Sequence, residues 1–302
     1  MTAYHYLPSK AQIEITTKCN LRCSICTINS LPVHKNMTFD KFKHILTSIF
    51  HNSLQRVILN GVGEPLLNPQ LLRMIKYCVE LGIPQIQIYT NATLLKGKIV
   101  KALALSGLTE IIYSFDGGTQ LSYEKIRKGA KFNEVVENIK NFTEKSKLPC
   151  RLHTVFNNEN FDSMVYIPEL AEYMNIKNIH LVEFIPFRTG KINTKYYNIS
   201  NYDKNIFLTI KEKCEARGIN LKIKMRKQKS SCFMPFQNIY IDIKGNITPC
   251  CRIQSGLYLG NILLNRIDEI WNSKKILMWR QKMLSEHPPN LCKTICSFKE
   301  AI

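Results

Sequence analysis

The chain lacks the features that mark several common protein classes. No segment approaches the run of about 20 apolar residues that a membrane-spanning helix needs. The start of the chain, MTAYHYLPSKAQIEITTKC, has neither an apolar stretch nor a small-residue cleavage site, so a secretory signal is not indicated. We also find no internal repeat, no low-complexity segment and no nucleic-acid-binding module. We therefore expect a cytoplasmic protein without a membrane span or a nucleic-acid partner.

Cysteine, by contrast, is plentiful and unevenly placed. The chain has 11 cysteines among 302 residues, an odd number. Without a secretion signal, metal ligation or catalysis explains them better than structural disulfides. One group lies near the start and another in the last quarter: Cys19, Cys23 and Cys26, then Cys232, Cys250, Cys251, Cys292 and Cys296. The three single cysteines between these groups are expected to be core residues: Cys78, Cys150 and Cys214.

The composition is basic. The formal net charge is +19 at pH 7, and basic residues concentrate over residues 125–131 and 222–229. Most of them fit solvated faces of helices and strands. A sharper interpretation is that they dock an acidic partner or bind an anionic substrate.

Strand-like and helix-like segments alternate over the first two thirds of the chain. The expected strands are 12–16, 56–60, 85–90, 110–114, 151–156 and 178–185. The expected helices are 39–50, 69–81, 99–105, 133–145, 167–174 and 204–217. Repeated βα units of this length predict the α/β class with a parallel sheet, and six of them suit an open, partial (β/α)6 barrel.

The pattern changes towards the C-terminus. A polar stretch over 188–203 is expected to form a loop or flap, and a β-hairpin is expected over 238–248, followed by short helices. We expect a core barrel over 1–203, a linking helix and strand over 204–226, and a small domain over 227–302. That last unit has little apolar content, so it is expected to need a metal to hold it together.

Cys19, Cys23 and Cys26 form a C-x-x-x-C-x-x-C motif directly after the first expected strand. Three thiolates on one loop hold three irons of a [4Fe–4S] cluster and leave the fourth iron open to a small molecule. Zinc is the alternative, although a zinc site usually closes its tetrahedron with a fourth ligand.

This motif resembles the signature of the radical S-adenosylmethionine (SAM) superfamily. Three further segments match that family in order, over about residues 10–200: Gly61–Pro65, Thr90–Asn91, and Ser114–Gly117 with Tyr123–Arg127. Two positions depart from the family pattern, since Ile25 replaces an aromatic residue and Val62 replaces a glycine. All the segments are at carboxyl ends of expected strands, where barrel enzymes carry their chemistry.

The resemblance implies a role for each matching residue. Gly63 and Glu64 would accept hydrogen bonds from the SAM ammonium, and Thr90 and Asn91 would complete the cofactor site. Ser114 and Asp116 would lie near the ribose and methionine parts of SAM. Arg127 would bind the methionine carboxylate, which suits the fork of an Arg side chain.

The C-terminal cysteines resemble the SPASM/Twitch subgroup, in its short form with one auxiliary [4Fe–4S] cluster. By that resemblance Cys232, Cys250, Cys292 and Cys296 would be the ligands. The last two are three residues apart instead of the usual two, so Cys251 is an alternative to Cys296. A zinc site is again the alternative. Cys251 is also a candidate hydrogen-atom donor, as in radical epimerases.

The resemblance implies reductive cleavage of SAM to a 5′-deoxyadenosyl radical, which abstracts hydrogen from a substrate C–H bond. An acidic flavodoxin- or ferredoxin-like electron donor would suit the basic surface. We expect a sugar or aminocyclitol-like small molecule, oxidised or epimerised in a biosynthetic pathway, as in the aminocyclitol dehydrogenases that the tail resembles. A peptide that is epimerised or crosslinked is the alternative. With 18 residues before Cys19, we expect no leader-binding domain of the kind that many peptide maturases carry, and this favours the small molecule. A non-catalytic iron–sulfur electron carrier is the third possibility.

Overall fold

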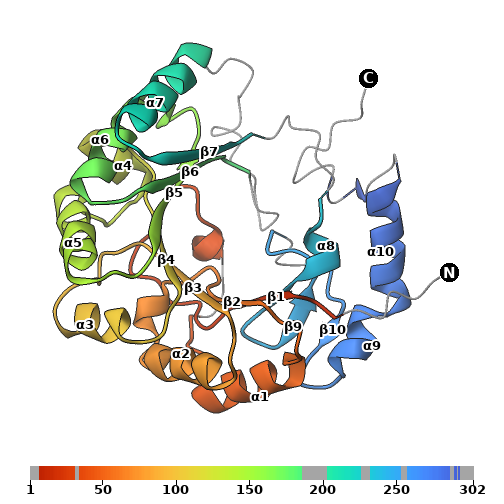
Figure 1. Cartoon of the computed structure of the whole chain (residues 1–302). Coiled ribbons are helices and arrows are strands. Elements are labelled where there is room, and N and C mark those ends of the chain that lie inside the picture. Colours follow the sequence, from red (N-terminus) through yellow and green to blue (C-terminus); the bar gives the residue numbers. More distant parts are fainter. Residues whose placement is uncertain are drawn as a thin grey trace.

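The computed structural model describes residues 7–30, 34–185, 203–225, 232–252, 257–285, 289–290 and 292. Within them, ten strands form one sheet in the order β10-β9-β8-β1-β2-β3-β4-β5-β6-β7. The sheet is curved, and helices cover its outer face (Figure 1). This is the partial barrel that the alternating pattern predicts.

Most of the sheet consists of strands β1 to β7, which run parallel to one another: β1 (Lys10–Ile13), β2 (Arg56–Leu59), β3 (Gln85–Thr90), β4 (Glu110–Ser114), β5 (Cys150–Phe156), β6 (Asn178–Glu183) and β7 (Asn220–Lys224). The helices between them are α1 (Phe39–Ile49), α2 (Leu71–Glu80), α3 (Lys98–Ala104), α4 (Gln120–Ile126), α5 (Phe132–Lys145), α6 (Ile167–Tyr173) and α7 (Lys204–Ala216). Three short 3-10 helices occur in the loops: η1 (Thr27–Ser30), η2 (Pro65–Leu67) and η3 (Phe161–Tyr166).

The C-terminal part continues the same sheet. Its elements are α8 (Met234–Gln237), β8 (Asn238–Ile241), β9 (Asn246–Thr248), β10 (Gly260–Asn261), α9 (Ile267–Trp271) and α10 (Lys274–Leu284). β8 pairs in parallel with β1, from Lys10 opposite Asn238 to Ile13 opposite Ile241. β9 pairs antiparallel with β8 and with β10. The hairpin that we expected in a separate small domain therefore extends the edge of the barrel.

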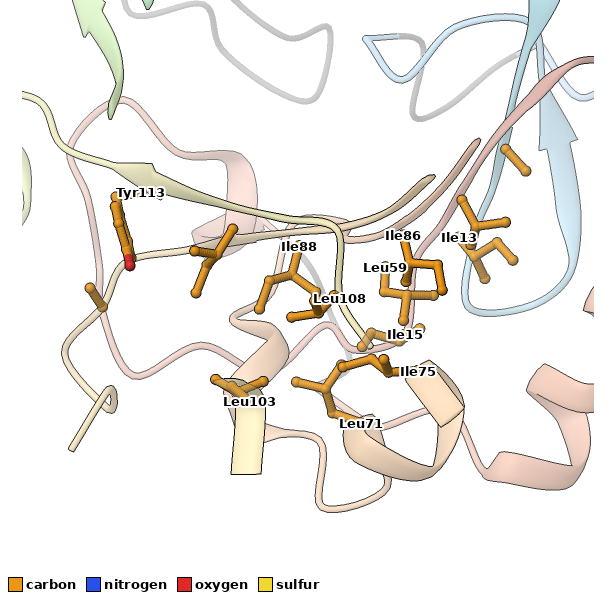
Figure 2. Packing of buried hydrophobic residues seen from close by; sticks show 14 of the residues in the cluster. Ile13, Ile15, Leu59, Leu71, Ile75, Ile86, Ile88, Leu103, Leu108 and Tyr113 are labelled. Atoms are coloured by element: carbon orange, nitrogen blue, oxygen red, sulfur yellow. The ribbon is translucent and has the colours of Figure 1, made fainter. Parts of the chain in front are cut away.

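The core lies between the outer face of the sheet and the helices. Ile13 is opposite Leu59 in the β1–β2 ladder, and Ile88 of β3 lies on the same face. Figure 2 shows these residues packed with Leu71 and Ile75 of α2. All five are buried. Side chains alternate along a strand, so this face leaves the residues between them to line the concave side.

Most expected elements are present within one or two residues of their predicted ends. The elements that the sequence pattern does not predict include α4, α8 and the 3-10 helices. They are short, and their sequences have no clear periodic pattern. The expected flap over 188–203 lies outside the described residues, except for Asp203, whose side chain caps α7. Cys78 and Cys214 are buried in the core as expected. No helix in the part of the chain that the structure describes is long and apolar enough to cross a bilayer.

Candidate functional site

The three N-terminal cysteines lie on the loop that follows β1. The backbone N–H of Leu21 donates to the Cys19 Sγ at 3.4 Å, and that of Ile28 donates to the Cys26 Sγ at 3.5 Å. Hydrogen bonds of this kind stabilise thiolates and tune iron–sulfur clusters. Burial raises the pKa of all three thiols, that of Cys23 to about 11, and the Cys26 thiolate also raises the pKa values of Cys19 and Cys23. The three sulfur atoms therefore share one buried region, and metal binding must displace their protons.

The segment after α4 holds this loop in place. The backbone N–H groups of Arg22 and Ser24 donate to the carbonyls of Lys128 and Ile126, at 3.0 and 2.8 Å. Arg127 lies between these two carbonyls. Its position explains why it is the main charge that lowers the pKa of Cys23 against the effect of burial.

Arg127 is fixed by an ion pair with Asp116. The Arg127 Nη2 lies 2.5 Å from the Asp116 Oδ2, and Asp116 also accepts the backbone N–H of Val155 at 2.7 Å. Burial alone would lower the pKa of Arg127, but Asp116 and Cys23 raise it. The buried Arg127 Nε has no hydrogen-bond partner among the described residues. A charged donor without a partner beside the cysteine loop fits an anionic group of a bound cofactor.

Glu64 follows β2, and its carboxylate accepts hydrogen bonds from other residues of the chain. The Oε1 accepts the Thr90 hydroxyl at 2.7 Å and the Leu66 N–H at 3.2 Å, and the Oε2 accepts the Asn91 N–H at 2.8 Å. Burial raises the pKa of Glu64. The side chain thus ties the ends of β2 and β3 together. The expected hydrogen bond from the SAM ammonium to Glu64 stays a prediction.

Gly63 is required for a contact within the chain. A Cβ at this position would come within 2.5 Å of the backbone oxygens of Thr16 and Lys18. The next residue, Glu64, donates its N–H to the Lys18 carbonyl at 2.8 Å. The loop after β2 therefore packs directly on the segment that leads to Cys19.

Asn91 connects the end of β3 to the cysteine loop. Its Nδ2 donates to the Asn20 Oδ1 at 3.1 Å and lies 3.9 Å from the Cys19 Sγ. Asn20 in turn donates to the Thr93 hydroxyl at 2.8 Å. Sequence reasoning missed Asn20, although its place directly after Cys19 was a usable signal. Ser114 ends β4, in register with His153 of β5.

Three C-terminal cysteines lie near one another. The Arg252 N–H donates to the Cys250 Sγ at 3.4 Å, and a hydrogen bond with Cys250 lowers the pKa of Cys251. Burial raises the pKa of Cys232, and Cys251 adds to that rise. Cys251 also raises the pKa values of Tyr89 and Tyr240, after burial, so it lies close to the concave face of the sheet.

Of the other two expected auxiliary ligands, Cys292 and Cys296, only Cys292 lies within the described residues. Cys292 is half-buried, and its N–H donates to the Pro289 carbonyl at 2.8 Å. Cys296 lies outside the described residues. Within the described residues, no three Cys, His, Asp or Glu side chains are arranged to hold a single metal ion. The donor chemistry, buried thiols on a loop with N–H groups directed at sulfur, fits a multi-iron cluster.

Glu14, which belongs to no recognisable sequence motif, joins the two halves of this region. Its Oε1 accepts the Val62 N–H at 3.2 Å and the Tyr240 hydroxyl at 2.9 Å, and its Oε2 accepts the Ile243 N–H at 3.1 Å. Burial raises the pKa of Glu14. One buried carboxylate thus connects the loop after β2 to the C-terminal hairpin.

Polar side chains of β3, β4 and β5 lie on the concave face. The ring centroids of Tyr89 and His153 are 5.5 Å apart, with the rings nearly perpendicular. Glu110 forms an ion pair with Arg151 and accepts the Gln87 amide at 2.6 Å. A polar lining of this kind is suited to a hydrogen-bonding ligand.

Comparison with known proteins agrees with this architecture. The profile of the radical SAM superfamily matches residues 13–171, and that of an iron–sulfur cluster-binding (SPASM) domain matches residues 232–297. A probable GTP 3′,8-cyclase of Saccharolobus islandicus is 27% identical over 188 residues, which are 62% of this chain and 60% of the relative. The chain thus spans less than two thirds of the length of the curated relatives that it matches.

Solved structures with low sequence identity share the fold. Streptococcus suis SuiB bound to the precursor peptide SuiA superposes with a TM-score of 0.71 at 16% identity, covering 98% of this chain and 71% of SuiB. BtrN in complex with SAM and 2-DOIA gives a TM-score of 0.54 at 17% identity, covering 92% and 87% of the two chains.

The chain belongs to the radical SAM superfamily and carries a C-terminal SPASM domain. Its cofactors are SAM and [4Fe–4S] clusters, as these two domains imply. The family and cofactors predicted from the cysteine motif are confirmed. The domain boundaries and the roles of individual residues stay predictions.

Proposed function

We propose that this enzyme abstracts a hydrogen atom from a C–H bond of a small polar molecule, of sugar or aminocyclitol type, which is oxidised or epimerised. The cofactor pair supplies the radical chemistry by reductive cleavage of SAM at the cluster of Cys19, Cys23 and Cys26. The observation that carries the proposal is the cysteine loop, held against the buried Arg127–Asp116 pair and facing a polar concave wall.

The chain's own residues bind and orient the cofactor in this proposal. Arg127 binds the methionine carboxylate through its unpartnered Nε, while Asp116 fixes the guanidinium. Backbone carbonyls of residues 61–63 accept from the methionine ammonium. Glu64 acts as a positioning residue, because its carboxylate already has three donors from the chain. Ser114 lies near the ribose.

Cys232, Cys250, Cys292 and Cys296 would hold one auxiliary [4Fe–4S] cluster in the short form of the domain, with Cys251 as the alternative to Cys296. The position of Cys251 near Tyr89 and Tyr240 gives it a second possible role, as hydrogen-atom donor to the substrate radical. An acidic flavodoxin- or ferredoxin-like protein would deliver electrons to the basic surface.

The test is a substrate screen with the anaerobically reconstituted, reduced enzyme. Sugars, aminocyclitols and their phosphates are added one at a time, and the release of 5′-deoxyadenosine is measured with the mass of the product. A stimulating compound that loses two hydrogens supports oxidation. One that keeps its formula but gains solvent deuterium supports epimerisation, and this gain should disappear in Cys251→Ala.

A peptide substrate is the second candidate, since SuiB, which shares the fold, has been solved with a precursor peptide bound. Stimulation by peptides alone would overturn the small-molecule proposal. A nucleotide is the third, because the curated relatives are named as GTP cyclases. Cluster absorbance without any SAM cleavage would favour the electron-carrier alternative instead.

A further inference from the structure

Basic side chains form one row across three neighbouring strands of the concave face. His153 of β5 is in register with His180 of β6, and His180 is in register with Lys222 of β7. In-register residues of parallel strands point to the same face, and adjacent strands are about 4.8 Å apart, so the row spans about 10 Å. Lys224 points to the same side, because it lies two residues beyond Lys222 on the same strand.

The row faces the interior of the partial barrel. Its neighbours on the same strands, Leu152, Ile179 and Leu181, are buried in the core on the opposite side of the sheet. At its inner end, His153 is in register with Ser114, one of the residues proposed to lie near SAM. A group held by this row would therefore share the barrel interior with the cofactor.

The positive charges in this region outnumber the carboxylates that balance them. Burial, Arg151 and His180 lower the pKa of His153 to about 3, and burial, Arg151 and Lys222 lower that of His180 to about 4. Glu110, the carboxylate that pairs with Arg151, is already used in that ion pair. Within the described part of the chain, His180, Lys222 and Lys224 form no ion pair with any carboxylate.

One atom of the row is a buried donor or acceptor that lacks a partner. The Nδ1 of His153 is inaccessible to solvent and has no hydrogen-bond partner among the described residues. Buried polar atoms of native proteins are normally satisfied. The missing partner of this atom is an observation separate from the charges of the row, and it indicates that a ligand completes the row.

We propose that this β5–β7 basic wall, made of His153, His180, Lys222 and Lys224, binds a phosphoryl group of the substrate. The proposal rests on the proposed function, and it narrows the substrate class to phosphorylated small molecules. Ammonium groups bind phosphate as point charges, whereas a planar carboxylate is best matched by an Arg fork. Donors spread over three strands suit the several oxygens of a phosphate or diphosphate.

The experiment titrates inorganic pyrophosphate into anaerobically reconstituted holoenzyme by calorimetry. Lys222→Met and His180→Gln are each expected to weaken binding about tenfold, the effect of losing one charged or neutral donor to an anion. Lys211→Met is the matched control. Lys211 is an exposed residue of α7 that pairs with Glu215, so this variant makes the same change in net charge away from the wall, and its affinity should stay within about twofold of wild type.

Three results would overturn the proposal. The first is that the Lys222→Met and His180→Gln variants bind pyrophosphate as tightly as the wild type does. The second is that Lys211→Met loses as much affinity as Lys222→Met does. Pyrophosphate would then be attracted by the overall positive charge of the protein and not by this wall. Malonate could bind more tightly than pyrophosphate through the same residues, which would assign a carboxylate. Release of 5′-deoxyadenosine by the wild type is measured separately. If no 5′-deoxyadenosine is released although pyrophosphate still binds, the proposed function is refuted, whereas the anion site is retained.

Discussion

Removing the Glu14 carboxylate should destabilise the protein at the junction between the loop after β2 and the C-terminal hairpin. Glu14→Ala leaves three donors without acceptors: the buried Ile243 N–H and Tyr240 hydroxyl, and the half-buried Val62 N–H. An unsatisfied buried group costs about 1–3 kcal/mol, although removing a buried carboxylate recovers part of its own desolvation cost. We expect a loss of about 3 kcal/mol in the free energy of unfolding.

A double-mutant cycle isolates the bond from Tyr240. Tyr240→Phe alone should cost about 1 kcal/mol, because Glu14 keeps its two backbone donors. The double variant should be about 1 kcal/mol more stable than the sum of the single changes predicts, since Phe has no hydroxyl to leave unsatisfied. The assay is urea unfolding of the reconstituted protein, followed by circular dichroism.

Glu80→Ala serves as the control for losing a carboxylate. Glu80 lies on the exposed face of α2 and, among the residues that the structure describes, forms an ion pair with Lys76 alone, at 3.8 Å. Its loss should change stability by less than about 0.5 kcal/mol. A Glu14→Ala effect as small as that of Glu80→Ala, or a cycle with no coupling, would refute the bridging role of Glu14.

Two further predictions concern the barrel interior. Arg127→Lys keeps a positive charge but loses the forked guanidinium that pairs with Asp116. The KM for SAM should therefore rise about tenfold, while the iron content stays at the wild-type level. A parallel loss of iron would show that Arg127 supports the cluster instead. His153 and His180 are held neutral, since their pKa values lie near 3 and 4 in the fold against about 6.5 in the unfolded chain. The unfolded chain therefore binds more protons, and stability that is complete above about pH 6.5 is lost as the pH falls. His153, the more deeply buried of the two, should contribute a loss of about 0.8 kcal/mol between about pH 7.5 and about pH 6.0, and His180 should contribute less, because it is partly exposed and solvent screens its charge. The double variant with Gln at both positions should flatten this slope in urea titrations, and an unchanged slope would contradict the buried neutral state.

The elements of the barrel were predictable because their signals are local. QIQIYT and EIIYS are rich in β-branched and aromatic residues, and both form strands with the predicted ends. The cysteine motif and Arg127 could be selected from spacing and order along the chain. The contacts of Arg127 with Asp116 and the cysteine loop then follow from the topology.

Other features depend on pairings between distant parts of the chain. β8 joins β1 across most of the sequence length, and no pattern in Asn238–Ile241 specifies that partner. The role of Glu14 depends on the same pairing. Glu64 matches a family motif, but its hydrogen bonds to Thr90 and Asn91 are set by how the ends of β2 and β3 meet. The basic wall likewise emerges only from the register of three strands.

The most direct test of the account is to reconstitute the protein anaerobically, reduce it with SAM present, and quantify iron and 5′-deoxyadenosine. We expect about eight irons per chain, for two [4Fe–4S] clusters, and 5′-deoxyadenosine release that disappears when Cys19, Cys23 and Cys26 are all replaced by alanine. About four irons with intact cleavage would remove the auxiliary cluster from the account. Full cluster content with no 5′-deoxyadenosine, or release that persists in the triple variant, would contradict its central claim.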